Sequence, residues 1–288
     1  MVLAAALLAS STILMKQIPL LTNLLPKDVA IWRFSIATPF FWLFYILKYR
    51  GVERTPGTPW RFLGLGCVFA AASFCAVFAL SKLSSSLFII IVYIYPTLIT
   101  LFSLIFGGRV PKLFWFGIPV TLVGIILLSI QTGSILKIDP VGFAITIVNA
   151  FAMAVYFFLS GRLFRTIQNK LLGTSWVMTG AMVAGMIMIP FLGVRFPETI
   201  KGWVLLFLLS FFGTLFPILA TNIGLQMVGA ARGGVIVMLQ PVLTVLLSMI
   251  FFNEKLSNLQ WVGGVLVIAA VVILQLSPDR PEKKSLSI

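Results

Sequence analysis

The sequence predicts an all-α membrane protein with ten transmembrane helices, arranged as two inverted repeats of five helices. Three observations predict this fold. The 288 residues are 60% hydrophobic and 10% charged, with a mean hydropathy of +1.11, whereas about a quarter of the residues of a soluble domain are charged. Apolar runs of about 20 residues, the length that crosses a bilayer, fill almost the whole chain. Two of these runs, one in each half, are nearly the same sequence.

Each apolar run is expected to form one helix. The expected spans are residues 2–21, 28–48, 60–80, 84–107, 113–131, 139–160, 173–192, 201–222, 231–252 and 257–276. Residues typical of helix starts support several of them. Asp139 offers an N-cap and Pro140 the first helical position of the sixth span. Ser257 and Gln260 have the spacing of a capping box before the last span.

The repeated sequence lies in the fourth and fifth runs and again in the ninth and tenth. Residues 92–106 read VYIYPTLITLFSLIF, and residues 237–251 read VMLQPVLTVLLSMIF. The repeating unit is therefore five spans, and because five is odd the second unit must enter the membrane from the opposite side. In such inverted repeats a substrate binds near the midplane, and access alternates between the two membrane faces. We expect a first repeat at 1–132, a second repeat at 133–276 and a cytoplasmic tail at 277–288.

The positive charges predict the orientation of the chain. Thirteen Lys and Arg residues lie in loops on the side that holds both termini, and seven lie on the opposite side. The positive-inside rule therefore predicts a multi-pass protein of the cell (plasma or inner) membrane with both termini in the cytoplasm. The net charge of +14 is scattered between apolar runs and does not form one basic face. We expect the lipid bilayer and a small molecule as partners, and no nucleic acid.

The residue types that are missing limit the chemistry. The chain has no histidine, which excludes Ser-His and Cys-His catalysis and histidine metal sites. All seven Asp and Glu residues lie in loops or at the ends of spans. A proton antiporter or an exporter of lipophilic cations would need a carboxylate near the middle of the membrane. We therefore expect no catalytic residue, cofactor or metal, and a neutral, zwitterionic or anionic substrate moved by facilitated diffusion or exchange.

Three residues inside the spans are the first candidates for the mechanism. Arg33 is the one charge plainly within a span, which makes it a functional-site candidate. Because it lies five residues from Asp28, its side chain could also reach the membrane interface or pair with another helix. Pro96 and Pro241 are candidate hinges, since each removes a backbone hydrogen bond in an equivalent helix. A simple packing kink is the alternative.

The remaining candidates for the substrate pocket are polar or aromatic side chains within the spans. They could contact a ligand or serve only the packing of helices. These candidates are Ser10, Ser11, Thr12, Phe74, Tyr93, Tyr95, Asn149, Tyr156, Phe157, Trp176, Asn222, Gln226 and Gln240. Glu254, at the end of the ninth span, is a candidate gate or an interfacial residue that shapes the following turn.

Several segments resemble a known family. Residues 229–273 are similar to the last two helices of the drug/metabolite transporter superfamily, EamA-like branch. The segment NAFAMAVYFFLSGRL (149–163) is similar to the sixth helix of that family, and Lys16 followed by Arg33 is similar to its first and second helices. The resemblance implies a ten-helix, five-plus-five inverted fold that exports small metabolites, often amino acids or related compounds.

Three positions depart from the family pattern. Leu8-Ala9 stands where the family often has Trp-Gly, and Gln240 stands where many members have Glu. Gly107-Gly108-Arg109 lacks the acid that the second copy keeps as Glu254.

We therefore expect a secondary transporter that exports a small, amino-acid-like metabolite by alternating access, and not an enzyme. A membrane-embedded lipid-modifying enzyme is one alternative, but the short, acid-poor loops offer few catalytic groups. A scaffold protein that keeps the fold without transport is the other, and the paired prolines count against it. One chain holds both halves of the expected pathway, so a monomer would suffice; an oligomer stays open.

Overall fold

The computed structural model describes residues 1–49, 59–80, 82–83, 88, 91–107, 113–129, 139–252 and 257–276. Most of these residues are helical. The elements are α1 (Val2–Leu21), α2 (Pro26–Lys48), α3 (Pro59–Leu80), α5 (Tyr95–Ile105), α6 (Phe114–Ser129), α7 (Pro140–Leu163), α8 (Lys170–Leu192), α9 (Ile200–Ser210), η1 (Phe211–Leu215), α10 (Phe216–Val228), α11 (Ala230–Val237), α12 (Leu239–Phe252) and α13 (Asn258–Leu276). The candidate gate Glu254 and the tail at 277–288 lie outside the described residues.

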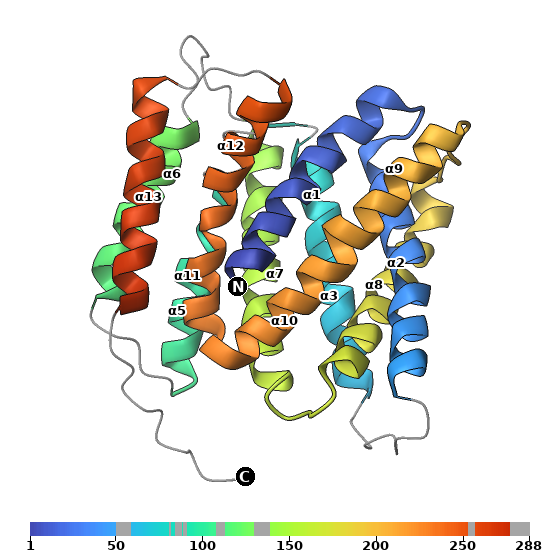
Figure 1. Ribbon diagram of the computed structural model, residues 1–288, viewed down its shortest axis with the longest axis horizontal. Coiled ribbons are helices and arrows are strands. Elements are labelled where there is room, and N and C mark those ends of the chain that lie inside the picture. Colours follow the sequence, from blue (N-terminus) through green and yellow to red (C-terminus); the bar gives the residue numbers. More distant parts are fainter. Residues whose placement is uncertain are drawn as a thin grey trace.

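The predicted fold class, an all-α membrane protein of ten spans in two inverted repeats, is confirmed. Six helical segments in the described part of the chain are long and apolar enough to cross a membrane, and they include the continuous rod formed by α9, η1 and α10. The other four spans are α5, α6, α11 with α12, and α13. The repeated helices α5 and α12 run in opposite directions (Figure 1), as an inverted repeat requires.

Side chains at the helix starts explain where several spans begin. Asp139 accepts a hydrogen bond from the backbone N–H of Gly142 at 2.8 Å, so the predicted N-cap of α7 is confirmed. The predicted capping box is also present before α13, where the Ser257 N–H donates to Gln260 Oε1 at 2.9 Å. Helix α8 begins three residues before its expected start because the Asn169 side chain caps it.

The spans are arranged in a row with two distinct ends (Figure 1). Helices α6 and α13 pack along each other at one end, while α2, α8 and α9 lie together at the other. Between them stand α1, α5, α7, α10, α11 and α12. Helix α3 of the first half (α1–α6) packs against both α7 and α8 of the second half (α7–α13), so it joins the two halves.

The two equivalent spans are broken at the same place. Helix is interrupted at Tyr93 and Ile94 in the fourth span and at Met238 in the ninth, where we expected continuous helices. The cause is the proline that follows each break. An α-helical N–H at position 96 or 241 would bond the carbonyl four residues earlier, and proline has no N–H to give. Those carbonyls belong to Val92 and Val237, which are the last helical residues before each break.

A second irregularity lies in the eighth span. Between α9 and α10 the chain forms the π-helical turn η1, in which the N–H of Phe216 bonds the carbonyl of Phe211. Pro217 follows directly, and its missing N–H favours such a local rearrangement of the backbone. Gly213 within the turn lies against α1, where an added Cβ would be 2.9 Å from Ser11 Oγ. The rod from α9 to α10 is therefore regular at both ends and irregular at its middle.

Glycines allow α3 and α8 to approach very closely. A Cβ added at Gly66 of α3 would collide with backbone atoms of Val177, Gly180 and Ala181 on α8. A Cβ added at Gly180 would collide with the backbone of Leu63. Small residues at helix crossings are the usual way in which membrane helices maximise contact. This crossing therefore joins the two halves through backbone contact, as does the crossing of α6 with α13, where a Cβ added at Gly124 would lie 2.9 Å from the carbonyl oxygen of Gly263.

Candidate functional site

A cluster of aromatic side chains occupies the region where the two halves meet. Phe34 of α2 contacts Phe69 of α3 edge-on, with ring centroids 5.6 Å apart. Phe69 in turn lies 4.8 Å from the ring of Tyr156 on α7. All three side chains are buried. The contact between Phe69 and Tyr156 crosses from the first half to the second, so the cluster lies at the interface where an inverted-repeat protein is expected to bind its substrate.

The cluster continues from Tyr156 to the first broken helix. Phe157, next to Tyr156 on α7, lies 5.4 Å from the ring of Tyr95, and Tyr95 lies 5.7 Å from Tyr93 at the break. We call Phe34, Phe69, Tyr93, Tyr95, Tyr156 and Phe157 the central aromatic cluster. Four of its members are predicted pocket residues that come from separate parts of the sequence, and the fold brings them together.

Arg33 lies at the edge of this cluster. Its guanidinium carbon is 4.7 Å from the ring centroid of Phe34 and 6.0 Å from that of Phe69. One terminal nitrogen, Nη1, donates to the sulfur of Met15 on α1 at 3.1 Å. The side chain is 8% exposed, and its Nε has no hydrogen-bond partner. Among the interpretations that the sequence left open, which are a functional group, pairing with another helix and reaching the membrane interface, the buried position disfavours the last.

Asn222 forms a compact polar node with three neighbours. Its Oδ1 accepts hydrogen bonds from Ser160 Oγ at 2.8 Å and from the Tyr156 hydroxyl at 3.2 Å. Its Nδ2 donates to Thr174 Oγ1 at 3.2 Å. The amide therefore connects α10 with α7 and α8, and it fixes the hydroxyl of one ring of the central aromatic cluster. Asn222 is fully buried.

The other polar candidates mainly bind neighbouring backbone. The Asn149 amide on α7 donates to the carbonyl of Ala72 on α3, which ties the two halves together. Ser10 donates to the carbonyl of Ala6 in its own helix at 3.1 Å. Ser11 is buried beside Gly213. The side chain of Thr12 lies outside the described part of the structure.

The remaining candidates are not part of the central aromatic cluster. Trp176 of α8 contacts Trp42 of α2, with centroids 5.0 Å apart at a right angle. Phe74 is buried on α3, while Gln226 on α10 and Gln240 at the start of α12 are half-buried. The structure thus divides the predicted set into a connected group around Arg33, Tyr156 and Tyr95 and a group of separate residues.

The two broken helices touch each other. A Cβ added at Gly234 of α11 would lie 2.9 Å from Ile99 Cδ1 and 3.8 Å from Pro96 Cβ, both on α5. Pro96 and its equivalent Pro241 on α12 are both buried. The break in the first half therefore packs directly against the helix that leads into the break of the second half.

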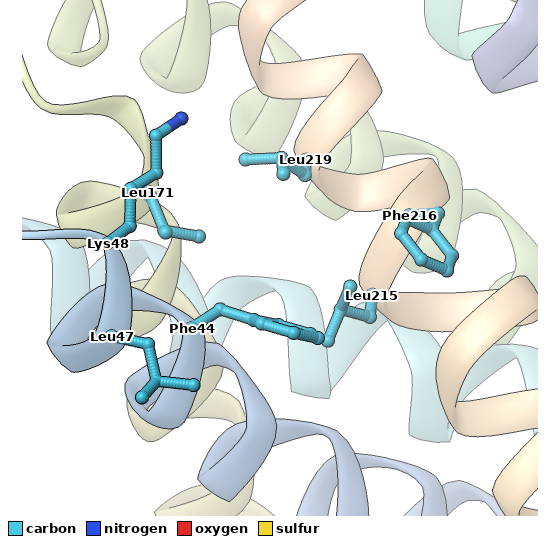
Figure 2. A pocket seen from close by; sticks show the side chains of 7 residues that line it. All are labelled: Phe44, Leu47, Lys48, Leu171, Leu215, Phe216 and Leu219. Atoms are coloured by element: carbon cyan, nitrogen blue, oxygen red, sulfur yellow. The ribbon is translucent and has the colours of Figure 1, made fainter.

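One open groove lies away from these residues. It has a volume of about 420 Å³ and is lined by Phe44, Leu47, Lys48, Leu171, Leu215, Phe216 and Leu219. Figure 2 shows Leu171 and Leu219 directed toward each other across the opening, with the Lys48 ammonium group turned away from it. No predicted site residue lines this groove. Its apolar lining and exposed phenylalanines are typical of a surface in contact with lipid, so we place the candidate site at the aromatic cluster instead.

Several residues that complete the site are not distinctive in the sequence. Phe34 and Phe69 are two of 26 phenylalanines, and nothing in their local sequence distinguishes them. Met15 precedes Lys16 in an apolar helix. Ser160 and Thr174 lie at the end of α7 and the start of α8, where small polar residues are ordinary. A search for polar residues near Asn222 in space would have found them, but that requires the fold.

Comparison with known proteins gives a consistent result. The model of the EamA-like transporter family matches residues 1–130 and again residues 140–276. The chain is 27% identical over 198 residues to the uncharacterized inner membrane transporter YedA of Escherichia coli K12, covering 67% of this chain and 63% of YedA. It is 23% identical over 253 residues to the uncharacterized transporter YcbK of Bacillus subtilis, covering 83% of this chain and 80% of YcbK. The matched part thus spans just under two thirds of YedA. A solved crystal structure shares the fold, with a TM-score of 0.80, 20% identity, and coverage of 95% of this chain and 94% of that chain.

Proposed function

Because the chain belongs to the EamA-like transporter family and is a multi-pass membrane transporter, we propose that it is a secondary transporter that exports a small, amino-acid-like metabolite by alternating access. The substrate is neutral, zwitterionic or anionic. It binds in the region of the central aromatic cluster, between a first repeat at 1–132 and a second at 133–276. Both termini lie on the cytoplasmic side of the cell membrane.

The observation that carries this proposal is the pair of equivalent breaks. Each removes helical hydrogen bonds next to the site, at Tyr93–Ile94 in one half and at Met238 in the other. Interrupted helices in corresponding positions of two repeats mark the binding site in many secondary transporters. Because the breaks belong to halves of opposite orientation, bending at one would open the path to one face of the membrane, and bending at the other would open the opposite face.

Another feature supports a fixed frame against which such bending can occur. The loop between α1 and α2 is bound to the loop between α8 and α9. Asn23 Nδ2 donates to the carbonyl of Phe196 at 2.9 Å, and Trp32 Nε1 donates to the carbonyl of Arg195 at 2.8 Å. The backbone N–H of Arg195 donates to Asp28 at 3.3 Å. These contacts join the two halves at the end of the molecule formed by α2, α8 and α9, away from α6 and α13 (Figure 1).

Alternating access can be tested with paired cysteines placed on either side of the breaks. Cys67 and Cys75 are free thiols and would first be replaced by alanine. Leu98 on α5 and Leu243 on α12 are equivalent residues of the two repeats, and both are half-buried. We expect Leu98→Cys and Leu243→Cys each to react with a membrane-impermeant maleimide from either side of the membrane, because the region between the two breaks opens to each face in turn.

A lipid-facing cysteine serves as the matched control. Val183 lies mid-span in α8 and is 43% exposed on the surface of the bundle, so Val183→Cys should stay unreactive, because a thiol in hydrocarbon does not ionise. A rigid scaffold would leave both test cysteines accessible from one face at most, and that result would exclude alternating access. A membrane enzyme with a fixed active-site cleft would give the same one-sided pattern.

A further inference from the structure

Arg33 is a buried cation without a buried anion beside it. Its groups face Met15 of α1, the ring of Phe34 on its own helix and the ring of Phe69 on α3. In the described part of the chain the one salt bridge joins Lys82 and Asp139. Intramembrane charges normally pair with each other or line a pathway for ions or substrates. Among the residues that the structure describes, Arg33 has no carboxylate partner, so its environment is that of a binding group.

The nearest carboxylate along the chain is already used elsewhere. Asp28 accepts a hydrogen bond from the backbone N–H of Leu25 through Oδ2 at 2.8 Å, and its Oδ1 accepts from the N–H of Arg195 at 3.3 Å. It thereby holds the start of α2 and the loop before α9. Arg33 lies seven residues after Pro26, about 10 Å along the helix. Asp28 therefore stabilises the loops and leaves the guanidinium without a carboxylate.

The hydrogen-bonding capacity of Arg33 is mostly unused. A guanidinium has five N–H donors in a planar fork that matches a carboxylate. Here one terminal nitrogen bonds a thioether, which is a weak acceptor, and Nε bonds nothing. Burying a charged group without adequate partners is unfavourable, and such a group is normally compensated when a partner arrives. The partner that would compensate Arg33 is an anion entering from the central region.

The surface next to the guanidinium is aromatic. Phe34 and Phe69 lie directly beside it, and Phe69 leads to Tyr156, whose hydroxyl is held by Asn222. A small inorganic anion would gain nothing from these rings. An organic anion with a flat or apolar body would gain both the charged contact and the burial of apolar surface. The guanidinium and the aromatic rings together therefore favour an organic anion with an apolar body over a small inorganic anion.

We propose that Arg33 binds the carboxylate of the transported substrate, and that Phe69 and Tyr156 contact its apolar body. This assignment rests on the proposed transport function and narrows its substrate class to organic carboxylates, zwitterionic ones included. Arg33 lies in the first half of α2, before the middle of the helix at Ala37, so the carboxylate is bound in the half of the membrane that contains the α1–α2 loop.

The test compares matched carboxylates and amides on purified full-length protein. The probes are phenylacetate with phenylacetamide, indole-3-acetate with indole-3-acetamide, and acetate alone. Binding is measured by the shift in thermal midpoint and by titration calorimetry. We expect an aromatic carboxylate to bind at least tenfold more tightly than its amide and acetate to bind weakly, because charge-assisted hydrogen bonds to a buried group contribute about ten- to a hundredfold in affinity.

Three variants locate the effect. Arg33→Gln should abolish the preference for the carboxylate, Arg33→Lys should weaken it because the planar fork is lost, and Arg61→Gln should behave as the original protein because Arg61 is exposed at the start of α3. If Arg33→Gln does not give a folded, monodisperse protein, Arg33→Lys decides, and an unchanged carboxylate affinity in it overturns the assignment. Equal binding of carboxylates and amides by the original protein, or no binding of either, also overturns it.

The test of carboxylate binding and the test of alternating access can fail independently of each other. Cysteine accessibility at Leu98 and Leu243 requires no bound carboxylate. Two-sided labelling together with no Arg33-dependent binding would leave alternating access standing and reject the carboxylate site. One-sided labelling with Arg33-dependent binding would instead indicate a carboxylate-binding membrane protein that does not transport.

Discussion

Asn222 joins three helices through a single amide. Its oxygen accepts from Tyr156 and Ser160, and its nitrogen donates to Thr174. In a lipid-embedded bundle hydrogen bonds of this kind act in place of the hydrophobic effect, which contributes little between helices in hydrocarbon. The same amide orients the Tyr156 hydroxyl in the central aromatic cluster, so at the level of single residues the packing of the second half and the shape of the site depend on one side chain.

Removing Asn222 should therefore cost more stability than removing one of its partners. Tyr156→Phe deletes one hydrogen bond of 3.2 Å and should lower the free energy of unfolding by about 0.5–1 kcal/mol. Asn222→Ala leaves several groups without a partner and creates a cavity, which should cost about 2–4 kcal/mol. Thermal or denaturant unfolding in detergent measures both variants. Comparable losses in the two would show that the hydroxyls of Ser160 and Thr174 find other acceptors.

Whole elements differ in how closely they are held together. Helices α3 and α8 cross backbone against backbone at Gly66 and Gly180. The contact between α5 and α11 is looser in kind, because Gly234 faces the flexible end of the Ile99 side chain. Junctions made of backbone atoms resist displacement, whereas a side chain can change its rotamer. We therefore infer that the backbone crossing of α3 with α8 is a fixed junction between the halves, and that the broken helices move.

A glycine pair on α3 tests the fixed junction. Gly66→Ala places a methyl group against backbone atoms of α8 and should destabilise the protein by about 1–3 kcal/mol through overpacking. Gly64→Ala lies two residues away, where nothing is within 4 Å of the added Cβ, and it should be neutral or slightly stabilising because alanine favours helix. Thermal unfolding of both variants gives the comparison. Equal midpoints for the two would show that α3 and α8 can separate without loss.

The sequence was sufficient to predict most elements but not their irregularities. Apolar runs and loop charges locate the spans, since a bilayer demands long apolar helices. Pro96 and Pro241 indicate that each helix is weakened, but the break lies about one turn before the proline. The helix ends there because the carbonyl four residues before the proline has lost its N–H donor. At the site, Arg33 and Asn222 are distinctive in an apolar chain and could be selected. Phe69 could not, because its role depends on which of the many phenylalanines the fold places beside Arg33.

The two ends of the molecule differ in how the halves are joined. At the end formed by α2, α8 and α9, hydrogen bonds connect loops of the two halves, and the described residues show no such loop contacts at the end formed by α6 and α13. Loops before α2 and before α9 are joined by hydrogen bonds from Asn23, Trp32 and Arg195, and Trp32 also contacts Phe196 at 5.0 Å. At the opposite end α6 and α13 pack on each other (Figure 1). If access alternates, we expect the relative motion to occur between these ends, at the contact of α5 with α11, where a flexible side chain faces a glycine.

Two crosslinks distinguish the moving contact from the fixed one. In a protein without Cys67 and Cys75, the pair Ile99→Cys and Gly234→Cys joins α5 to α11, and loss of the Ile99 side chain makes room for the new Cβ at position 234. The pair Asn23→Cys and Glu198→Cys joins the two tied loops, whose side chains lie 3.1 Å apart at Nδ2 and Oε1. A short bifunctional thiol reagent closes each pair before reconstitution.

We expect the link between α5 and α11 to abolish exchange between the two access states, and the link between the loops to leave it intact. The readout is reduction of a nitroxide spin label by an impermeant reductant added to one face at a time, with the label attached at position 243 through an orthogonal unnatural amino acid. Both access states should be detected in the loop-linked protein and only one in the helix-linked protein, because a motion can be blocked only at a contact that changes during it. If the loop link blocked exchange and the helix link did not, the tied end would be the moving one, and the frame proposed for α2, α8 and α9 would have to be exchanged with α6 and α13.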